Sequence, residues 1–223
     1  MLAVRDGLLG HGRKGRKMKR FVIIGGAEIR NYALIRESLG ENDYYVYCDC
    51  GLKHQEGLGG MPDLIIGDFD SHSRPEDLSN VIVLPVVKDD TDTIFAVKEG
   101  IRRGYEDFLL IGATGGRQDH NLGNIYSLLM LKNAGRSAKI LDDYSEMSIV
   151  SSGEECRVKK GWRFFSLLNI SGTARGITIT GAKYELNGAE ILPEYQYGIS
   201  NEVSGEEAVI SLKEGSLLLV CIR

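Results

Sequence analysis

Two carboxylates stand one residue apart directly after an apolar run. The run ends at Ile66, and the segment Gly-Asp-Phe-Asp-Ser follows it at residues 67–71. A hard divalent cation such as Mg²⁺ takes oxygen ligands, typically one or two carboxylates together with water and substrate phosphates. Asp68 and Asp70 therefore indicate a Mg²⁺ site that serves a phosphate substrate, although Asp and Ser are also common turn residues after a strand.

Other acidic residues also follow apolar, strand-like runs. They are Asp49, the group Asp89, Asp90 and Asp92, and Asp119. Ligands of open α/β sheets bind beyond the carboxyl ends of the strands, so we expect these carboxylates to gather at one edge. Gathered carboxylates repel one another and require a cation. Each also has a local alternative, because Asp90 or Thr91, and Asp119, suit the N-cap of the helix that follows.

A glycine-rich segment has the opposite preference, for an anion. Gly115 and Gly116 precede Arg117 and a helix-like segment, and backbone N–H groups at a helix N-terminus bind anions. Arg117 can hold phosphate oxygens with two hydrogen bonds, and Lys88 is a second candidate for a phosphate contact. His120 fits a general acid or base, a phosphate or sugar partner, or an ordinary first-turn residue. The segment lacks the Gly-Lys-Ser/Thr ending of a Walker A loop.

Alternating strand-like and helix-like patterns must position these residues. The expected strands cover residues 21–24, 44–48, 64–66, 81–84, 108–111 and 138–141, and the expected helices cover 91–103 and 119–133. Gly104 and Gly135 stand where glycine commonly ends a helix. This alternation is typical of an α/β unit with a mainly parallel sheet.

Beyond Tyr144 the pattern changes to short runs rich in Val, Ile, Thr and Tyr. They cover residues 147–150, 162–168, 177–180, 209–212 and 217–221, which is typical of an all-β unit such as a small sandwich. We therefore predict a basic leader at 1–17, an α/β catalytic domain at 18–142 and a β domain at 143–223. The leader is expected to be a disordered tag or an extension from an upstream start codon, with a tail that contacts polyanions as the alternative.

Composition and charge limit the class of protein. The 223 residues are 43% hydrophobic and 26% charged, which is ordinary for a globular protein. The net charge is −4, yet residues 1–20 hold seven Lys and Arg against one Asp, which leaves 20 basic and 30 acidic residues in the remainder. That balance argues against nucleic acid as a partner. No apolar run reaches the length of a membrane span, and four scattered cysteines predict reduced thiols, so we expect a cytoplasmic location.

Three segments together resemble a known family. Residues 62–71, 88–93 and 112–124, in this order and spacing, are similar to the thiamine pyrophosphokinases, also called thiamine diphosphokinases. The resemblance implies a Rossmann-like α/β domain followed by a β-sandwich domain, and a homodimer with thiamine near the subunit interface. It also implies a reaction in which Mg-ATP gives its pyrophosphoryl group to thiamine, with AMP as the other product.

The resemblance also assigns roles to positions of this sequence. Asp68, Asp70 and Asp92 match metal and catalytic positions, and Arg117 and Asp119 match a catalytic Gly-Gly-Arg-x-Asp motif. Ser200 and Asn201 match a segment associated with thiamine. The residues expected to bind ATP are Asp49, Gly51, Ser71, Lys88, Thr91, Gly115, Gly116, Arg117 and His120.

Two other functions stay open at the level of sequence. A haloacid-dehalogenase-like, Mg²⁺-dependent phosphatase also places Asp-x-Asp after an apolar strand and uses the first Asp as nucleophile. That reading leaves the Gly-Gly-Arg segment without a role. A nucleotide-sensing module without catalysis would bind Mg-ATP and leave it unchanged. The products formed from ATP and thiamine separate the three functions.

Overall fold

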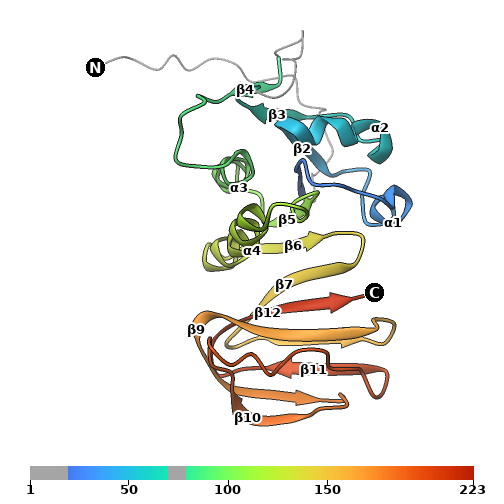
Figure 1. Ribbon diagram of the computed structural model, residues 1–223, viewed down its shortest axis with the longest axis vertical. Helices are drawn as coiled ribbons and strands as arrows, with labels where there is room; N and C mark the ends of the chain where they lie inside the picture. Colours follow the sequence, from blue (N-terminus) through green and yellow to red (C-terminus); the bar gives the residue numbers. More distant parts are fainter. Residues whose placement is uncertain (1–19, 70–78) are drawn as a thin grey trace.

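The computed structural model describes residues 20–69 and 79–223 (Figure 1). The expected leader at residues 1–17 and the predicted site residues Asp70 and Ser71 lie outside the described residues. Within the described ranges, twelve strands form one hydrogen-bonded sheet, and helices pack on both faces of its first half. The fold is therefore mixed α/β around one large sheet.

The first six strands are parallel and carry the candidate site at their carboxyl ends. Their order in the sheet is β4-β3-β2-β1-β5-β6. Their bounds are β1 (Phe21–Ile24), β2 (Tyr44–Cys48), β3 (Leu64–Gly67), β4 (Val81–Val83), β5 (Asp107–Ile111) and β6 (Ser137–Leu141). All four residues of β1 are completely buried, as expected for a central parallel strand covered on both faces. The six strands predicted from the sequence are confirmed, with each end within one residue of its expected place.

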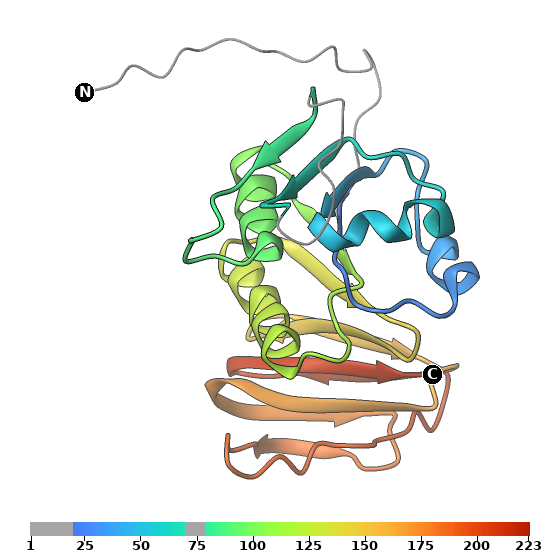
Figure 2. The ribbon, with the colours of Figure 1, turned by 45° about the horizontal axis from the view of Figure 1, so that its top comes forward.

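Helices cover the two faces of this parallel part, as Figure 2 shows from a second direction. On one face α3 (Asp92–Arg102) and α4 (Gln118–Asn133) contribute Val97 and Leu131 to an apolar core. On the other face lie α1 (Tyr32–Glu37), the short 3₁₀ helix η1 (Asp49–His54) and α2 (Gln55–Leu58). Both predicted helices are present, and both are followed by a glycine with positive φ, Gly104 at 83° and Gly135 at 71°. Within the two described ranges, no helix combines the length and the apolar character that crossing a membrane requires.

Antiparallel strands continue the same sheet beyond β6. They are β7 (Ser145–Ser151), β8 (Glu155–Lys159), β9 (Phe164–Thr180), β10 (Leu186–Glu190), β11 (Glu207–Ser211) and β12 (Glu214–Ile222). The order is β6-β7-β12-β9-β11-β8, with β10 paired to β9. This half has an apolar core of its own, which includes Phe165, Ile179 and Ile210. The sheet is nevertheless continuous, because β6 and β7 are hydrogen-bonded neighbours.

Two of the expected strands are the two ends of one strand. β9 runs for 17 residues; its first part pairs with β12, and its last part pairs with β10 and β11. Gly172 and Gly176 have φ angles of 83° and 67°, which glycine adopts without the penalty that a Cβ would bring. The glycines therefore let β9 change neighbours without ending, so the expected break between residues 168 and 177 is wrong.

Candidate active site

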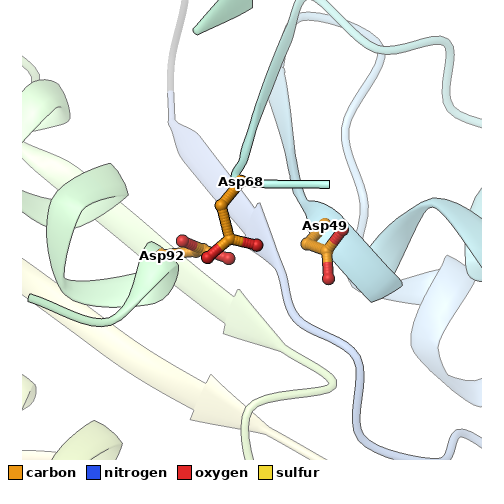
Figure 3. A group of neighbouring side chains, drawn as sticks. All are labelled: Asp49, Asp68 and Asp92. Carbon is orange, nitrogen blue, oxygen red and sulfur yellow. The ribbon is translucent and has the colours of Figure 1, made fainter. Parts of the chain in front are cut away.

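Three carboxylates meet where β2, β3 and α3 approach one another. Asp49 directly follows β2, Asp68 follows β3, and Asp92 is the first residue of α3. One carboxylate oxygen of each residue lies within 4.8 Å of the other two (Figure 3). Because β2 and β3 are adjacent parallel strands, their carboxyl ends bring Asp49 and Asp68 to the same edge of the sheet. We call these three residues the acidic cluster.

Lys88 lies against two members of the acidic cluster. Its Nζ is 2.5 Å from Asp68 Oδ2 and 3.1 Å from Asp92 Oδ1. Burial alone would lower the pKa of Lys88, but the hydrogen bonds and charges of the two carboxylates outweigh burial and raise it, so the ammonium group stays charged. Three carboxylates and one ammonium group leave a net charge of −2. A divalent cation would neutralise that charge.

Two buried oxygens of the acidic cluster accept no hydrogen bond from the residues that the structure describes. They are Asp49 Oδ1 and Asp92 Oδ1; the second lies 3.1 Å from the Lys88 ammonium, with which it forms an ion pair. Burial raises the pKa of Asp92, Lys88 offsets part of that rise, and the charges of Asp68 and Asp49 add to it. Leaving buried carboxylate oxygens without partners is costly. The unpartnered Asp49 oxygen and an all-carboxylate donor set therefore fit a hard cation such as Mg²⁺.

The backbone is strained next to this cluster. Asp49 has a φ of 35° and Phe69, directly after Asp68, has a φ of 56°. A non-glycine residue rarely takes a positive φ, and such strain persists where the surrounding structure fixes it, often at functional sites. The backbone strain is therefore consistent with a functional role for the acidic cluster.

A cavity of about 430 Å³ opens beside the acidic cluster. Its lining comes from the loops after β1, β2 and β5 and from the first turns of α3 and α4, and it includes Asp92, Gly115 and Gly116. A Cβ on Gly25 would lie 2.5 Å from the carbonyl oxygen of Gly112, so the loops after β1 and β5 can pass this closely only without a side chain. A glycine-lined cavity at the start of a helix suits phosphate groups.

Four of the other predicted ATP residues also line the cavity, namely Asp49, Thr91, Arg117 and His120. Thr91 is the N-cap of α3, and its Oγ1 accepts a hydrogen bond from the Ile94 N–H at 3.3 Å. The capping interpretation is therefore confirmed at this residue. Gly51 lies in η1, behind the cavity wall, where a Cβ would be 2.2 Å from the carbonyl oxygen of Ile24.

Arg117 and Asp119 form an exposed ion pair at the mouth of the cavity. Arg117 Nη2 lies 2.5 Å from Asp119 Oδ2, and the two side chains are 70% and 64% exposed. The hydrogen bond from Arg117 holds the pKa of Asp119 down to about 2. The expectation that Asp119 caps α4 is wrong, because the helix begins at Gln118 and Arg117 occupies the N-cap position. Arg117 lines the cavity, whereas Asp119 is not part of the lining and is connected to it only by its ion pair with Arg117.

Two asparagines of α4 hold the glycine-rich segment, and the sequence analysis missed both. Asn121 accepts a hydrogen bond from the Gly115 N–H at 2.8 Å and donates one to the Gly115 carbonyl at 2.7 Å. Asn124 donates to the Ala113 carbonyl at 2.7 Å. Both side chains line the cavity. Their spacing of three residues on one helix, directly after the Gly-Gly-Arg motif, is the signal that could have found them.

The loop after β1 is held from the other side by η1. His54 Nε2 lies 2.8 Å from the Ala27 carbonyl oxygen, and His54 Nδ1 lies 2.7 Å from the Tyr32 hydroxyl oxygen. A carbonyl can only accept, so we assign the proton to Nε2 and the acceptor role to Nδ1. Lys53 Nζ donates to the Gly26 carbonyl at 2.5 Å. Two neighbouring residues thus fix two consecutive carbonyl groups of the cavity wall.

This arrangement predicts a pH-dependent stability for His54. Burial lowers the pKa of His54 below its ordinary 6.5, so folding favours the neutral ring. The stability that the neutral His54 ring contributes to the folded state is therefore fully present above the unfolded-state pKa. It is lost as the pH falls through 6.5 towards the folded-state pKa. Denaturant unfolding between about pH 7.5 and about pH 5.5 should show a steeper loss of unfolding free energy in the wild type than in His54→Gln. Equal slopes in the two proteins would contradict the prediction.

The turn between β6 and β7 ties the two halves of the chain to the cavity loops. Asp142 Oδ2 accepts a hydrogen bond from Thr114 Oγ1 at 2.8 Å. The Asp143 carboxylate accepts hydrogen bonds from the N–H groups of Arg30 and Asn31, both at 2.9 Å. The turn therefore holds the loops after β1 and β5 at once.

The predicted thiamine residues lie in the β half, and the structure does not bring them to the cavity. The cavity lining runs only from residue 25 to residue 124. The Asn201 side chain is occupied, because it accepts from the Tyr184 N–H and donates to the Tyr184 carbonyl. Ser200 is exposed and has a φ of 61°, and its N–H donates to Ser166 Oγ. The Asn201 side chain is thus engaged within its own chain, whereas Ser200 is accessible and has a strained backbone.

Comparison with known proteins agrees with this geometry. Residues 35–140 match the family model described as the thiamin pyrophosphokinase catalytic domain, and residues 155–217 match the thiamin pyrophosphokinase vitamin B1 binding domain. The chain is 26% identical over 210 residues to a thiamine pyrophosphokinase of Bacillus subtilis (strain 168), an alignment that covers 91% of this chain and 98% of that protein.

Solved structures give the same result. A crystal structure of thiamin pyrophosphokinase from Geobacillus thermodenitrificans has a TM-score of 0.78 and 28% identity, covering 92% of this chain and 97% of that one. The thiamine pyrophosphokinase of Bacillus subtilis has a TM-score of 0.80 over 92% and 99% of the two chains; at 24% identity this likeness concerns the fold. The two family models together span more than half of the sequence. The chain belongs to the thiamin pyrophosphokinase family.

Proposed function

We propose that the chain is a thiamine diphosphokinase. It transfers the pyrophosphoryl group of Mg-ATP to the hydroxyl group of thiamine and yields thiamine diphosphate and AMP. The observation that carries the proposal is the acidic cluster, in which Asp49 Oδ1 is buried without a partner among the described residues, beside a glycine-lined cavity in a chain of this family. The cluster suits the metal of a nucleotide, and the cavity suits its phosphates.

The residues that would hold Mg²⁺ are those of the acidic cluster. The resemblance names Asp68, Asp70 and Asp92, and the geometry adds Asp49, whose Oδ1 is buried and without a partner in the described residues. When bound, the ion supplies positive charge against the phosphate oxygens. Lys88 contacts both Asp68 and Asp92, so these carboxylates are already held close together and would need little reorganisation on binding a cation.

The side chains around the cavity position the reactants. The thiamine hydroxyl oxygen bonds to the β-phosphorus of ATP, the bond from that phosphorus to the oxygen shared with the α-phosphate breaks, and AMP leaves with that oxygen. The hydroxyl proton passes to solvent or to a nearby carboxylate. Lys88 and Arg117 offset negative charge on the transferred group, and the Gly115 and Gly116 backbone approaches the phosphates closely. Positioning and charge supply most of the catalysis in phosphoryl transfer.

Thiamine would bind between the acidic site and a β half. Its thiazolium ring is a cation, which an acid-rich site attracts. Ser200 is the accessible member of the predicted thiamine pair, and it lies apart from the cavity lining of its own chain. The homodimer that the resemblance implies would let the β half of one chain approach the cavity of another. We therefore include the homodimer in the proposal.

The finer division of the chain is also a proposal. A Rossmann-like domain at 18–142 and a β-sandwich domain at 143–223 are supported by two apolar cores that each lie within one half; a third core lies mainly in the first half and includes Leu218 of β12. The hydrogen bonds between β6 and β7 join the two domains through one sheet. The cytoplasmic location expected from the composition belongs to the same proposal.

One assay tests the function directly. The purified chain is incubated with Mg-ATP and thiamine, and the products are separated by chromatography. Equal amounts of AMP and thiamine diphosphate are expected, and their loss on chelation of the metal. Free inorganic phosphate with an aspartyl-phosphate at Asp68 would instead identify a phosphatase. Metal-dependent ATP binding without any product would identify a sensing module.

A further inference from the structure

A second cavity lies at the junction of the two halves, away from the acidic cluster. It has a volume of about 300 Å³ and is enclosed by the last turns of α4, the start of β6, the middle of β7 and the turn after β7. Figure 1 shows these elements side by side. The lining shares no residue with the candidate active site. Nothing in the proposed transfer reaction uses this cavity.

The cavity fills a fork between two strands. β6 spans residues 137–141 and β7 spans 145–151, but the ladder between them covers only Ile140 with Met147 and Leu141 with Glu146. Beyond that ladder the two strands separate, and Ser137 and Ser148 line the space between them. Strand edges that are not paired present backbone N–H groups to a ligand. The fork is thus a polar recess in an otherwise continuous sheet.

The charge of the lining favours an anion. Three basic residues, Lys132, Arg136 and Lys139, line the cavity against one carboxylate, Glu154. Two of the three are already engaged: Lys132 Nζ lies 2.5 Å from Glu154, and Lys139 Nζ lies 2.7 Å from Glu146, outside the lining. These two lysines contribute positive charge to the cavity, but each already forms an ion pair with a glutamate. The cation left to make a new contact is Arg136.

Arg136 is unusually poorly paired for a half-buried arginine. Its side chain is 25% exposed, and its nearest carboxylate among the described residues is Glu106, at 4.0 Å from Nη1 and 86% exposed. Its Nε is buried and makes no hydrogen bond to any described residue. A buried guanidinium N–H without a partner is costly, and the planar group is shaped to hold two oxygens of one phosphate.

We propose that this fork binds the phosphate group of a small molecule, with Arg136 as the direct contact and Lys132 and Lys139 supplying the surrounding charge. The cavity lining also includes the apolar side chains of Leu128 and Ile149, which would contact a short apolar substituent on that phosphate. The ligand is therefore either inorganic phosphate or a small phosphomonoester. The site is independent of the acidic cluster and of the transfer reaction.

The test follows backbone amide signals of the full chain by NMR during titration with inorganic phosphate, without Mg²⁺ and at constant ionic strength set by chloride. Saturable shifts are expected at Ser137, Ala138 and Ser148. Shifts at Gly115 and Gly116 report the active site separately. Arg136→Gln should weaken binding at the fork by at least about tenfold, and Arg136→Lys by less. Arg175→Gln removes an exposed arginine that is paired with Glu190, and should behave as the wild type.

The same spectra show whether each variant is folded, and Arg136→Lys keeps the charge if Arg136→Gln fails to fold. A second titration with phenyl phosphate identifies the ligand: tighter binding than inorganic phosphate supports a phosphomonoester, and equal binding supports free phosphate. Absence of saturable shifts at the fork would overturn the proposal. So would fork shifts that are unchanged in both Arg136 variants.

Discussion

Asp92→Asn is expected to lower kcat/KM for thiamine diphosphate formation by about a thousandfold, or about 4 kcal/mol of transition-state stabilisation, without lowering the unfolding free energy. Asparagine keeps the shape of Asp92 but removes a charge from a cluster that needs its charge to hold a cation. Burial and the neighbouring carboxylates raise the pKa of Asp92, so ionised Asp92 destabilises the folded state at neutral pH. Removing the charge relieves that cost while activity is lost.

Asp90→Asn is the matched control for this prediction. Asp90 lies two residues away, and its carboxylate accepts hydrogen bonds from Lys98 on α3 at 2.6 and 2.8 Å, outside the acidic cluster. Its activity should stay within about twofold of the wild type, since an exposed ion pair contributes little. Steady-state kinetics and denaturant unfolding of both variants provide the comparison. An Asp92→Asn protein that retains a tenth of the activity would disprove the assigned role.

The convergence of Asp49, Asp68 and Asp92 was predictable because it follows from topology, whereas Asp90 and Asp119 do not join them and pair with Lys98 and Arg117. Parallel strands place their carboxyl ends on one edge, so Asp49 and Asp68 meet once β2 and β3 are neighbours. The order of the strands is not visible in the sequence. The pattern of residues predicted that Asp49 would join the other carboxylates, and the resemblance assigned it to the nucleotide; the structure places one of its oxygens within 4.8 Å of Asp68 and Asp92.

The residues that hold the cavity loops were harder to predict, because their contacts span long stretches of chain. Asp143 bonds the loop at Arg30, 113 residues away, and His54 bonds Ala27, 27 residues away. A local pattern shows that Asp143 stands in a turn, and nothing local says which loop its carboxylate reaches. Such residues become visible only when the fold brings separate loops together.

The length of an element and the local signals in its sequence also explain which elements the sequence analysis missed. The six-residue α1 and the four-residue α2 are too short to show a helical period. The break predicted within β9 came from a turn-like segment that contains Gly172 and Gly176. In the fold, Gly172 lies in a stretch that the ladder with β12 skips, and pairing with β12 resumes at Ala174 and Arg175; Gly176 precedes Ile177, which pairs with β10. A glycine-containing segment alone cannot distinguish a bend from an end, because the distinction depends on the neighbouring strands.

Gly51→Ala is expected to lower the unfolding free energy by about 3 kcal/mol and to weaken ATP binding with it. A Cβ on Gly51 would lie 2.2 Å from the Ile24 carbonyl oxygen and 3.2 Å from that of Gly25. These are backbone atoms of β1 and its loop, so η1 must move away, and Asp49 in the same 3₁₀ helix moves with it. Gly123→Ala in α4 meets no atom within 4 Å and should raise stability by up to about 1 kcal/mol. Denaturant unfolding and ATP titration of both variants test this; equal stability of the two would show that the close approach of Gly51 to β1 is not required.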